Sequence, residues 1–358
     1  MKKYILLNPG PVNVSPRVQQ ALLRGDLCHR EEEFSDLLVA IRTKLLQAFA
    51  PSGYTAIPVT GSGTLAVESM VSSALPDGKK LLVINNGVYG ERMLRMAEAH
   101  RIPTVELRYD WTQRPDLGQI ESALRDDPAI HAVALVHHET TTGLLNLVTE
   151  VGAITRRAGL WLLLDAVSSL AAEDLDLVHD SVDLCACTAN KCIQGIPGVS
   201  FVLVRNEAMA AMVQYPRRSL YLHLPLHWEA QEKRSVPFTP SVQTWYALDE
   251  ALDELLEETV AKRVQRHHVA AQLLREGFTR LGLKTLLPAA HQSNTLTSLF
   301  LPEGMSYPRI HDGLKERGFV IYEGQGKLQT GIFRVANMGH LTLDDFRRFL
   351  GVLEEVLG

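Results

Sequence analysis

Over its first 205 residues the chain alternates short apolar or β-branched runs with segments of helical periodicity. This alternation, with helices of about 10–15 residues, predicts βαβ units and a mainly parallel sheet. The apolar run Leu160–Leu164 fits a strand that is covered on both faces. The predicted strands are Thr55–Thr60, Lys80–Asn85, Thr104–Arg108, Ala129–Val136, Leu160–Asp165, Val182–Ala186 and Val199–Val204. The predicted helices lie near Thr64–Ala74, Gly90–His100, Asp116–Asp126 and Thr149–Ala158.

The pattern changes in the last third of the chain. The stretch Pro216–Pro240 is predicted to be irregular, and helical spacing of apolar residues follows it. The elements predicted after it are helices over Ala247–Leu256 and Val260–Leu281, strands near Thr295–Phe300 and Ile332–Ala336, a helix around Ile310–Arg317 and a closing helix over Leu343–Leu357. We therefore expect an N-terminal arm (1–14), a large α/β domain (15–250) and a small α+β domain (251–358).

Charge and cysteine usage exclude several classes of protein. The net charge is −5, from 36 Lys and Arg against 41 Asp and Glu, without the basic stripe that nucleic-acid binding requires. The apolar run Tyr4–Leu7 is too short for a signal peptide, and no stretch reaches the roughly 18–20 apolar residues of a membrane span. Four cysteines in a chain of this size are typical of a reducing compartment. A cytoplasmic protein with no nucleic-acid or membrane partner is expected.

The first candidate site is the sequence Thr60-Gly61-Ser62-Gly63-Thr64, which follows a predicted strand and opens a predicted helix. Small residues let backbone N–H groups approach a ligand, and a helix N-terminus favours an anion. The hydroxyls of Ser62 and Thr64 add donors that suit phosphate oxygens. Neither a Walker lysine nor the third glycine of a dinucleotide motif follows. On its own, the motif is equally compatible with a glycine-rich turn and a helix cap.

Two ionisable residues close predicted strands further along the chain. Asp165 ends the run Leu160–Leu164, and Asn190-Lys191 follows the next strand. Ligands of open α/β sheets bind at the carboxyl ends of strands. A lysine at such a place is costly to desolvate unless it is paired or used in covalent chemistry. Taken singly, Asp165 could be a cap and Lys191 could reach solvent.

The three features together match the needs of one cofactor, pyridoxal phosphate. It needs a cup for its phosphate, a carboxylate that keeps its ring nitrogen protonated, and an amine for an imine. The carboxylate matters because the protonated ring withdraws electrons from the reacting carbon. The sequence therefore predicts a pyridoxal-phosphate enzyme with Asp165 and Lys191 as its catalytic residues.

On these residues the chain resembles the class V aminotransferases of the fold-type-I pyridoxal-phosphate enzymes, over nearly its whole length. The pieces that carry the resemblance are Leu7-Asn8-Pro9-Gly10-Pro11, Thr60-Gly61-Ser62-Gly63-Thr64, His138-Glu139-Thr140-Thr141-Thr142-Gly143, Asp165-Ala166-Val167-Ser168-Ser169, Asn190-Lys191 and Phe333-Arg334-Val335. The resemblance implies a large domain with a mainly parallel seven-stranded sheet flanked by helices, and a small C-terminal α+β domain. It also implies a homodimer with active sites at the subunit interface.

The resemblance assigns roles residue by residue. Lys191 would carry the Schiff base, and Asp165 would contact the pyridine nitrogen. The other residues implied to bind the cofactor are Ser62, Gly63 and Thr64 at the phosphate, Tyr89 and Val167 on the ring faces, Thr140 near the ring oxygen, Asn190 beside the lysine, and Thr239 at the phosphate of the neighbouring subunit. Val236 stands where many relatives have a tyrosine that also contacts this phosphate.

Within the family, the resemblance implies a ping-pong transfer of the amino group from 2-aminoethylphosphonate to pyruvate, giving phosphonoacetaldehyde and alanine. Arg334 would hold the substrate carboxylate, a bidentate task that lysine performs poorly. Arg30 is a second candidate for the donor's anion, although an ion pair with the following glutamates is equally compatible with its position.

Three alternatives remain open at this point. An alanine–glyoxylate or serine–pyruvate aminotransferase would share every cofactor residue. A cysteine desulfurase would need a nucleophilic cysteine well after the lysine, and none follows Cys192. A metal-binding or other ligand-binding protein could use Cys185, Cys187 and Cys192, but no C-x-x-C pair occurs and a strand core explains buried cysteines equally well. No metal site is expected.

Overall fold

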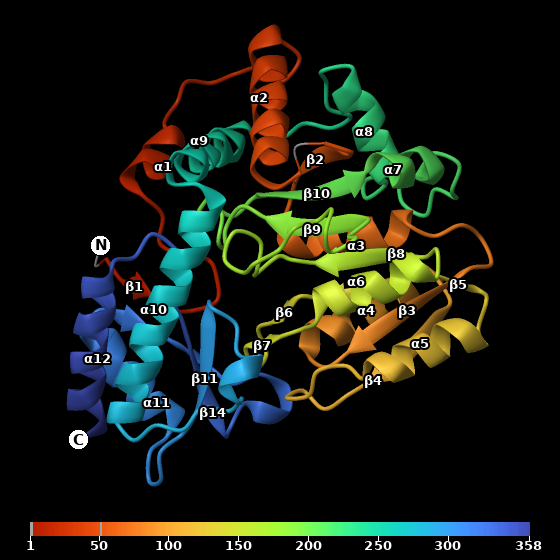
Figure 1. The fold of residues 1–358 in the computed structure, drawn as a ribbon. Coiled ribbons are helices and arrows are strands. Elements are labelled where there is room, and N and C mark those ends of the chain that lie inside the picture. Colours follow the sequence, from red (N-terminus) through yellow and green to blue (C-terminus); the bar gives the residue numbers. More distant parts are fainter. Residues whose placement is uncertain (1–2, 51) are drawn as a thin grey trace.

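The computed structural model describes residues 3–50 and 52–358, and its centre is a seven-stranded sheet (Figure 1). The strand order is β2-β10-β9-β8-β5-β3-β4. Their bounds are β2 Tyr54–Thr60, β3 Lys80–Asn85, β4 Thr104–Arg108, β5 Ile130–Val136, β8 Trp161–Asp165, β9 Leu184–Thr188 and β10 Val199–Arg205. Only β10 runs antiparallel to its neighbours β2 and β9, and the other pairs are parallel. The predicted mainly parallel sheet of seven strands is confirmed.

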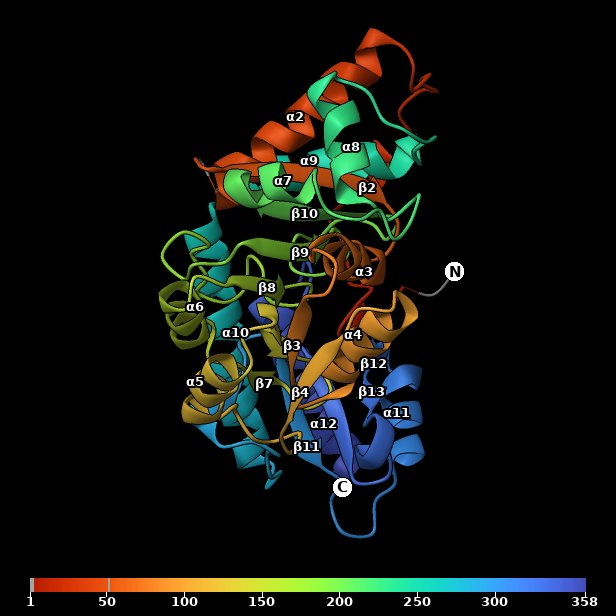
Figure 2. The same ribbon diagram turned by 90° about the vertical axis from the view of Figure 1, so that its right-hand side faces the viewer.

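Helices cover both faces of this sheet. On one face lie α3 (Gly63–Ser73), α4 (Val88–Ala99), α7 (Asn206–Met212) and α8 (Leu224–Glu232), and on the other lie α2 (Glu32–Phe49), α5 (Leu117–Asp126), α6 (Val148–Arg157) and α9 (Val242–Glu258). Figure 2 shows α5 and α6 on the left of the strands and α3 and α4 on the right. Strand β3 shows why its sequence is continuously apolar. Leu81 and Val83 pack into one core, while Leu82 and Ile84 pack into the other.

The C-terminal part forms a second, smaller layer. Its elements are α10 (Val260–Arg280), β11 (Leu296–Phe300), α11 (Tyr307–Glu316), β12 (Phe319–Val320), β13 (Tyr322–Glu323), β14 (Ile332–Ala336) and α12 (Leu343–Leu357). Strands β11, β14 and β13 form an antiparallel sheet, and helices α10, α11 and α12 supply a third apolar core around Phe278 and Phe349.

The N-terminal segment joins this smaller layer. Strand β1 (Ile5–Leu6) pairs in parallel with β12, and Leu7 is buried in the third core. Of the predicted arm 1–14, residues 1 and 2 lie outside the described residues. Helix α9 runs through residue 250 and still packs on the first core through Leu255. The next helix, α10, starts after Thr259, whose φ is 73°, and it packs on the third core.

The structure corrects two predicted segments and adds others. The stretch predicted to be irregular contains α8, which begins with Pro225 in its first turn, where a missing N–H costs nothing. Strand β9 starts and ends two residues later than predicted. The elements outside the predicted set are α1 (Pro16–Ala21), α2, α7 and the short strands β1, β6 (His138–Glu139), β7 (Leu144–Leu145), β12 and β13.

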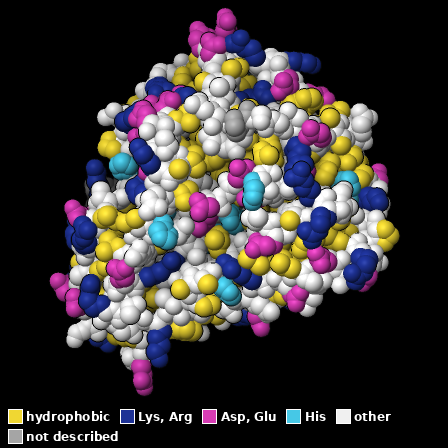
Figure 3. Space-filling model, viewed as in Figure 1, with side chains coloured by type: hydrophobic (Ala, Val, Ile, Leu, Met, Phe, Trp, Pro, Cys, Tyr) yellow, Lys and Arg dark blue, Asp and Glu magenta, His cyan; other side chains and the backbone are white. Residues whose placement is uncertain are grey.

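On the face drawn in Figure 3, Lys and Arg side chains are interspersed with Asp and Glu, and charges of one sign form no large patch. Among the described helices, none combines the length and apolar character needed to cross a bilayer. Within residues 3–50 and 52–358, no group of three or more His, Cys, Asp or Glu side chains is arranged to hold a metal ion.

Candidate active site

The chemistry-bearing residues meet where β8 and β9 end and α3 begins. Strands β8 and β9 are adjacent and parallel, so Asp165 at the end of β8 and Lys191 in the turn after β9 lie at the same edge of the sheet. Gly63 packs into this edge. A Cβ on Gly63 would lie 3.0 Å from Val167 Cγ1 and 3.2 Å from Thr188 Cβ. Any larger residue there would push the start of α3 away from the two strand ends.

Lys191 has an amine without a hydrogen bond or an ion pair to any described residue. Burial lowers the pKa of this amine to about 8, against the opposing effect of the nearby Asp165. Gly10 packs directly on the lysine. A Cβ at Gly10 would lie 2.5 Å from Lys191 Cδ and 2.8 Å from Nζ, and its φ of 99° also favours glycine. The N-terminal segment therefore forms one wall around this amine.

Asp165 is buried, and its carboxylate is held in place by the backbone. Its Oδ1 accepts a hydrogen bond from the Val167 N–H at 3.0 Å. Burial raises the pKa of Asp165 to about 6, while the charges of Arg92 and Lys191 act in the opposite direction. At neutral pH the group is therefore mostly a carboxylate, and it can hold a cationic ring nitrogen.

The start of α3 has donors available for an anion. Ser62 is the N-cap residue and is exposed, and its side chain makes no capping hydrogen bond. Thr64, also exposed, accepts a hydrogen bond from Arg92 Nη1 at 3.3 Å. The first N–H groups of a helix have no partner within it. The residues present thus fit a phosphate group at this helix end.

Arg334 lies on β14 of the smaller layer and is only 5% exposed. Its Nε donates to the Glu323 carbonyl oxygen at 2.8 Å, and its Nη1 donates to the Thr140 carbonyl oxygen at 2.8 Å. Within the described residues it forms no ion pair with a carboxylate. A buried guanidinium without a counter-ion is costly, which indicates that an anionic ligand completes this part of the site.

Glu139 is a residue whose role the sequence did not reveal. It is fully buried, and its Oε2 accepts the Tyr89 N–H at 3.1 Å while its Oε1 accepts the Thr141 hydroxyl at 2.6 Å. A Cβ at Gly87 would lie 2.2 Å from Glu139 Cδ, so only glycine leaves room for this carboxyl. Burial raises the pKa of Glu139 to about 7. Glu139 caps α4 and fixes Tyr89 at its first turn.

The structure of the single chain does not bring all the predicted site residues together. Asn190 accepts a hydrogen bond from the Thr188 hydroxyl at 2.8 Å, which places it beside Lys191. Thr239 is exposed in the loop before α9 and has no hydrogen bond to the other site residues of this chain. Arg30 is exposed in the segment between α1 and α2. Helix α2 lies at the top of Figure 1, whereas β14 lies low in it. The structure does not bring Arg30 next to Arg334.

A family comparison decides what kind of protein carries this arrangement. Residues 19–337 match the model of the family described as Aminotransferase class-V. The chain belongs to the class-V aminotransferases.

Curated members of the family resemble the chain over its full length. It is 37% identical over 360 residues to a 2-aminoethylphosphonate–pyruvate transaminase of Syntrophobacter fumaroxidans, covering 99% of this chain and 96% of that protein. A protein of the same name from Vibrio cholerae is 37% identical over 361 residues, covering 99% and 98%.

Solved structures of related aminotransferases share the fold. An alanine–glyoxylate aminotransferase from Nostoc sp. superposes with a TM-score of 0.94 at 28% identity, covering 100% of this chain and 96% of that one. An aspartate aminotransferase from Thermus thermophilus gives a TM-score of 0.91 at 28% identity, covering 98% of each chain. The predicted fold-type-I architecture of this class-V aminotransferase is confirmed.

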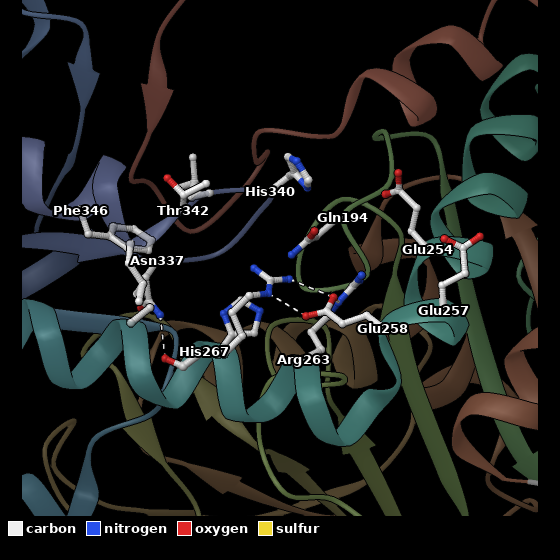
Figure 4. A pocket seen from close by; sticks show the side chains of 14 residues that line it. Gln194, Glu254, Glu257, Glu258, Arg263, His267, Asn337, His340, Thr342 and Phe346 are labelled. Carbon is white, nitrogen blue, oxygen red and sulfur yellow. Dashed lines mark hydrogen bonds and ion pairs between the residues drawn. The ribbon is translucent and has the colours of Figure 1, made fainter.

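Residues that line a cavity of about 550 Å³ beside α9, α10 and α12 form hydrogen bonds to the turn after Lys191 (Figure 4). Arg263 Nη1 donates to the carbonyl oxygens of Cys192 at 3.3 Å and Ile193 at 3.2 Å, and its Nε donates to Glu258 at 2.7 Å. Gln194 Nε2 donates to the Gly339 carbonyl oxygen at 2.9 Å. These bonds fix the backbone that carries Lys191.

Replacing Arg263 with alanine is expected to lower the free energy of unfolding by about 1–3 kcal/mol, because it leaves the buried carbonyl groups of Cys192 and Ile193 without their partner, while Glu258 keeps its ion pair with Arg266. Urea unfolding followed by circular dichroism measures this change. The control is Arg157→Ala, which breaks an exposed ion pair with Glu121 and should cost less than about 1 kcal/mol. Equal effects of the two substitutions would contradict the anchoring role.

Proposed function

We propose that this aminotransferase uses pyridoxal phosphate to transfer the amino group of 2-aminoethylphosphonate to pyruvate, giving phosphonoacetaldehyde and alanine. The observation that carries the proposal is the unpartnered amine of the half-buried Lys191, which lies near the buried Asp165 in a site that also holds a buried guanidinium without a counter-ion among the described residues. The names of the full-length relatives at 37% identity support the choice of donor and acceptor.

The residues proposed to hold the cofactor come from several elements around the strand ends. Ser62, Gly63 and Thr64 would bind its phosphate at the N-terminus of α3, and Asp165 would accept the ring N–H. The proposed neighbours of the ring are Tyr89, Thr140, Val167 and Asn190. Bound there, pyridoxal phosphate would supply the aldehyde that takes up the amino group and a ring that withdraws electrons.

Lys191 is proposed to attach the cofactor and then to move protons. Once the donor has displaced it, its amine can take the proton from the carbon that bears the donor nitrogen. A pKa of about 8 keeps an appreciable fraction of this amine unprotonated near neutral pH. The ionised Asp165 holds the positive charge of the ring nitrogen throughout. Gly10, packed on the lysine, limits where the amine can swing.

Arg334 is proposed to orient the anionic end of both substrates. Its Nε and Nη1 are held by the carbonyl oxygens of Glu323 and Thr140, which presents the remaining N–H groups in a fixed plane. A planar fork suits the carboxylate of pyruvate and two oxygens of a phosphonate. Arg30 of a neighbouring subunit is the proposed second contact of the phosphonate.

The enzyme is proposed to act in the cytoplasm as a homodimer in which Thr239 reaches the phosphate of the adjoining active site. The proposal is supported by large apolar side chains that are exposed in the single chain, among them Leu23 at 84% and Leu220 at 62% exposure. Mixing Lys191→Ala and Thr239→Ala chains tests the sharing of residues. If Thr239 acts in the site of the partner subunit, a mixed dimer has one site with both residues intact, and if it acts in its own site, a mixed dimer has none.

The lowered pKa of Lys191 predicts how fast the apoprotein takes up pyridoxal phosphate at different pH values. Covalent attachment needs the neutral amine, so the rate should rise about tenfold per pH unit below pH 8 and level off above it. Borohydride trapping followed by mass spectrometry of the Lys191 peptide measures this rate. A rate that keeps rising to about pH 10.4, the ordinary lysine value, would contradict the burial argument.

A donor screen tests the substrate choice. Aminoethylphosphonate, serine and alanine are compared as donors, with pyruvate and glyoxylate as acceptors. The expected result is a kcat/KM for 2-aminoethylphosphonate with pyruvate at least about 100-fold above those of the other pairs. A site built to bind a phosphonate is left with unpaired polar groups when a donor lacks the phosphonate, and this disfavours such donors. Faster reaction of alanine or serine with glyoxylate would replace the proposal with the alternative activity.

A further inference from the structure

Arg92 is a cation of the site that the proposed function leaves without a task. It lies on α4 three residues after Tyr89, so both side chains share one face of the helix. Its guanidinium carbon lies 4.5 Å from the centre of the Tyr89 ring, and its Nη1 donates to the Thr64 hydroxyl at 3.3 Å. Among the described residues it forms no ion pair, and its other N–H groups make no hydrogen bond.

Two neighbours fix the place of this guanidinium. The ring of Tyr89 supports its flat face, and Thr64 in the first turn of α3 supports one edge. Its charge lowers the pKa values of both Asp165 and Lys191, so it lies within electrostatic reach of both. Arg92 therefore stands on the α3 side of the site. Arg334 is held by other elements, through hydrogen bonds to the carbonyl oxygens of Thr140 and Glu323.

The α3 side needs such a charge. A phosphate monoester carries nearly two negative charges at neutral pH, whereas a helix N-terminus supplies only about half a positive charge and hydroxyl groups supply none. A guanidinium held beside Thr64, with free N–H groups and no competing carboxylate, supplies the missing charge and a planar set of donors. We infer that Arg92 binds the phosphate group of the cofactor together with Ser62, Gly63 and Thr64. This inference rests on the proposed use of pyridoxal phosphate.

The test compares two ligands that differ only in the phosphate. Dissociation constants of pyridoxal phosphate and of unphosphorylated pyridoxal are measured by absorbance titration of the apoprotein, for the wild type, Arg92→Gln and Arg92→Lys. We expect Arg92→Gln to weaken binding of pyridoxal phosphate about 10- to 100-fold, the usual effect of losing charged hydrogen bonds, and to leave pyridoxal binding within about twofold. Arg92→Lys should fall between the two because it keeps the charge without the planar fork.

The control is Arg95→Gln, an exposed arginine on the same helix, which should leave both dissociation constants unchanged. Equal weakening of both ligands by Arg92→Gln would overturn the inference, since it would indicate that Arg92 only supports Tyr89. So would an unchanged cofactor affinity combined with a raised KM for 2-aminoethylphosphonate, which would place Arg92 at the donor. A wild-type protein that binds both ligands equally weakly would overturn the cofactor assignment itself.

Discussion

Replacing Lys191 with alanine is expected to lower kcat for transamination by at least about 10⁴-fold. The substitution removes both the amine that attaches the cofactor and the base that moves the proton, and general acid–base catalysis alone contributes about 10²–10⁴-fold. Alanine formation from pyruvate, measured under saturating donor and cofactor, gives kcat. The absorbance of the covalently attached cofactor should disappear as well.

The same substitution should not harm the fold. Burial lowers the pKa of this amine, so below about pH 8 the folded protein carries a cost for holding it protonated, and the alanine variant no longer carries that cost. The apoprotein of Lys191→Ala is therefore expected to melt at the same temperature as the wild type or above it. Lys262→Ala, at an exposed position on α10, is the matched control and should keep both kcat and stability.

A small amine added to Lys191→Ala should restore part of the activity, since it can enter the space left by the side chain and act as the base. Recovery should depend on the size of the amine because Gly10 closes one side of this space. Activity of the alanine variant within tenfold of the wild type would contradict the assignment of Lys191.

Replacing Arg334 with glutamine is expected to lower kcat/KM for pyruvate by about 100-fold. The loss reflects the charged, bidentate hydrogen bonds that the guanidinium makes to the carboxylate. Hydrogen bonds to charged groups contribute about 1.5–3 kcal/mol. Steady-state kinetics with varied pyruvate measure it, and the effect should appear mainly in KM because the carboxylate is bound in both ground and transition states. Arg334→Lys should recover only part of the loss, since a lysine offers no fork.

The donor half of the reaction shows which anion Arg334 holds. We expect Arg334→Gln to slow the half-reaction with 2-aminoethylphosphonate to a similar degree and to leave the reaction of 2-aminoethanol, which has no anionic group, within about threefold. Arg30→Ala tests the second proposed contact of the phosphonate. If both variants keep the wild-type kcat/KM for 2-aminoethylphosphonate, neither arginine recognises the donor, and the proposed phosphonate site is wrong.

Local pattern was enough to find most of the fold. Strands buried on both faces have a continuous apolar signal, and β3 was predicted with its observed bounds, Lys80–Asn85. Prolines misled the prediction at α8, because Pro225 occupies the first helical turn, where it does not interrupt hydrogen bonding. Helix α2 carried a readable signal in the spacing of Phe34, Leu38, Ile41 and Leu45, all of which are buried.

The residues of the candidate site also fall into those that local pattern revealed and those that it did not. Asp165 and Lys191 stood out because ionisable residues directly after buried strands are rare, and parallel neighbours bring such strand ends together. Arg92 and Glu139 did not stand out, although Arg92 lies three residues after Tyr89 and Glu139 lies inside the motif His138–Gly143. An arginine within a predicted helix and a glutamate beside threonines are both common in sequences, and only the contacts that they make in the folded chain give them a role.

The sequence by itself determined the alternation of strands and helices, the parallel sheet, and the pairing of an acid with a lysine at its edge, because these depend on the periodicity of neighbouring residues. Only the tertiary structure decided what surrounds that pair. Gly10, Glu139, Arg92 and Arg334 come from four separate elements, and their roles follow from contacts across long stretches of chain. Burial and the absence of a counter-ion are properties of that assembled environment, so no local pattern could show them.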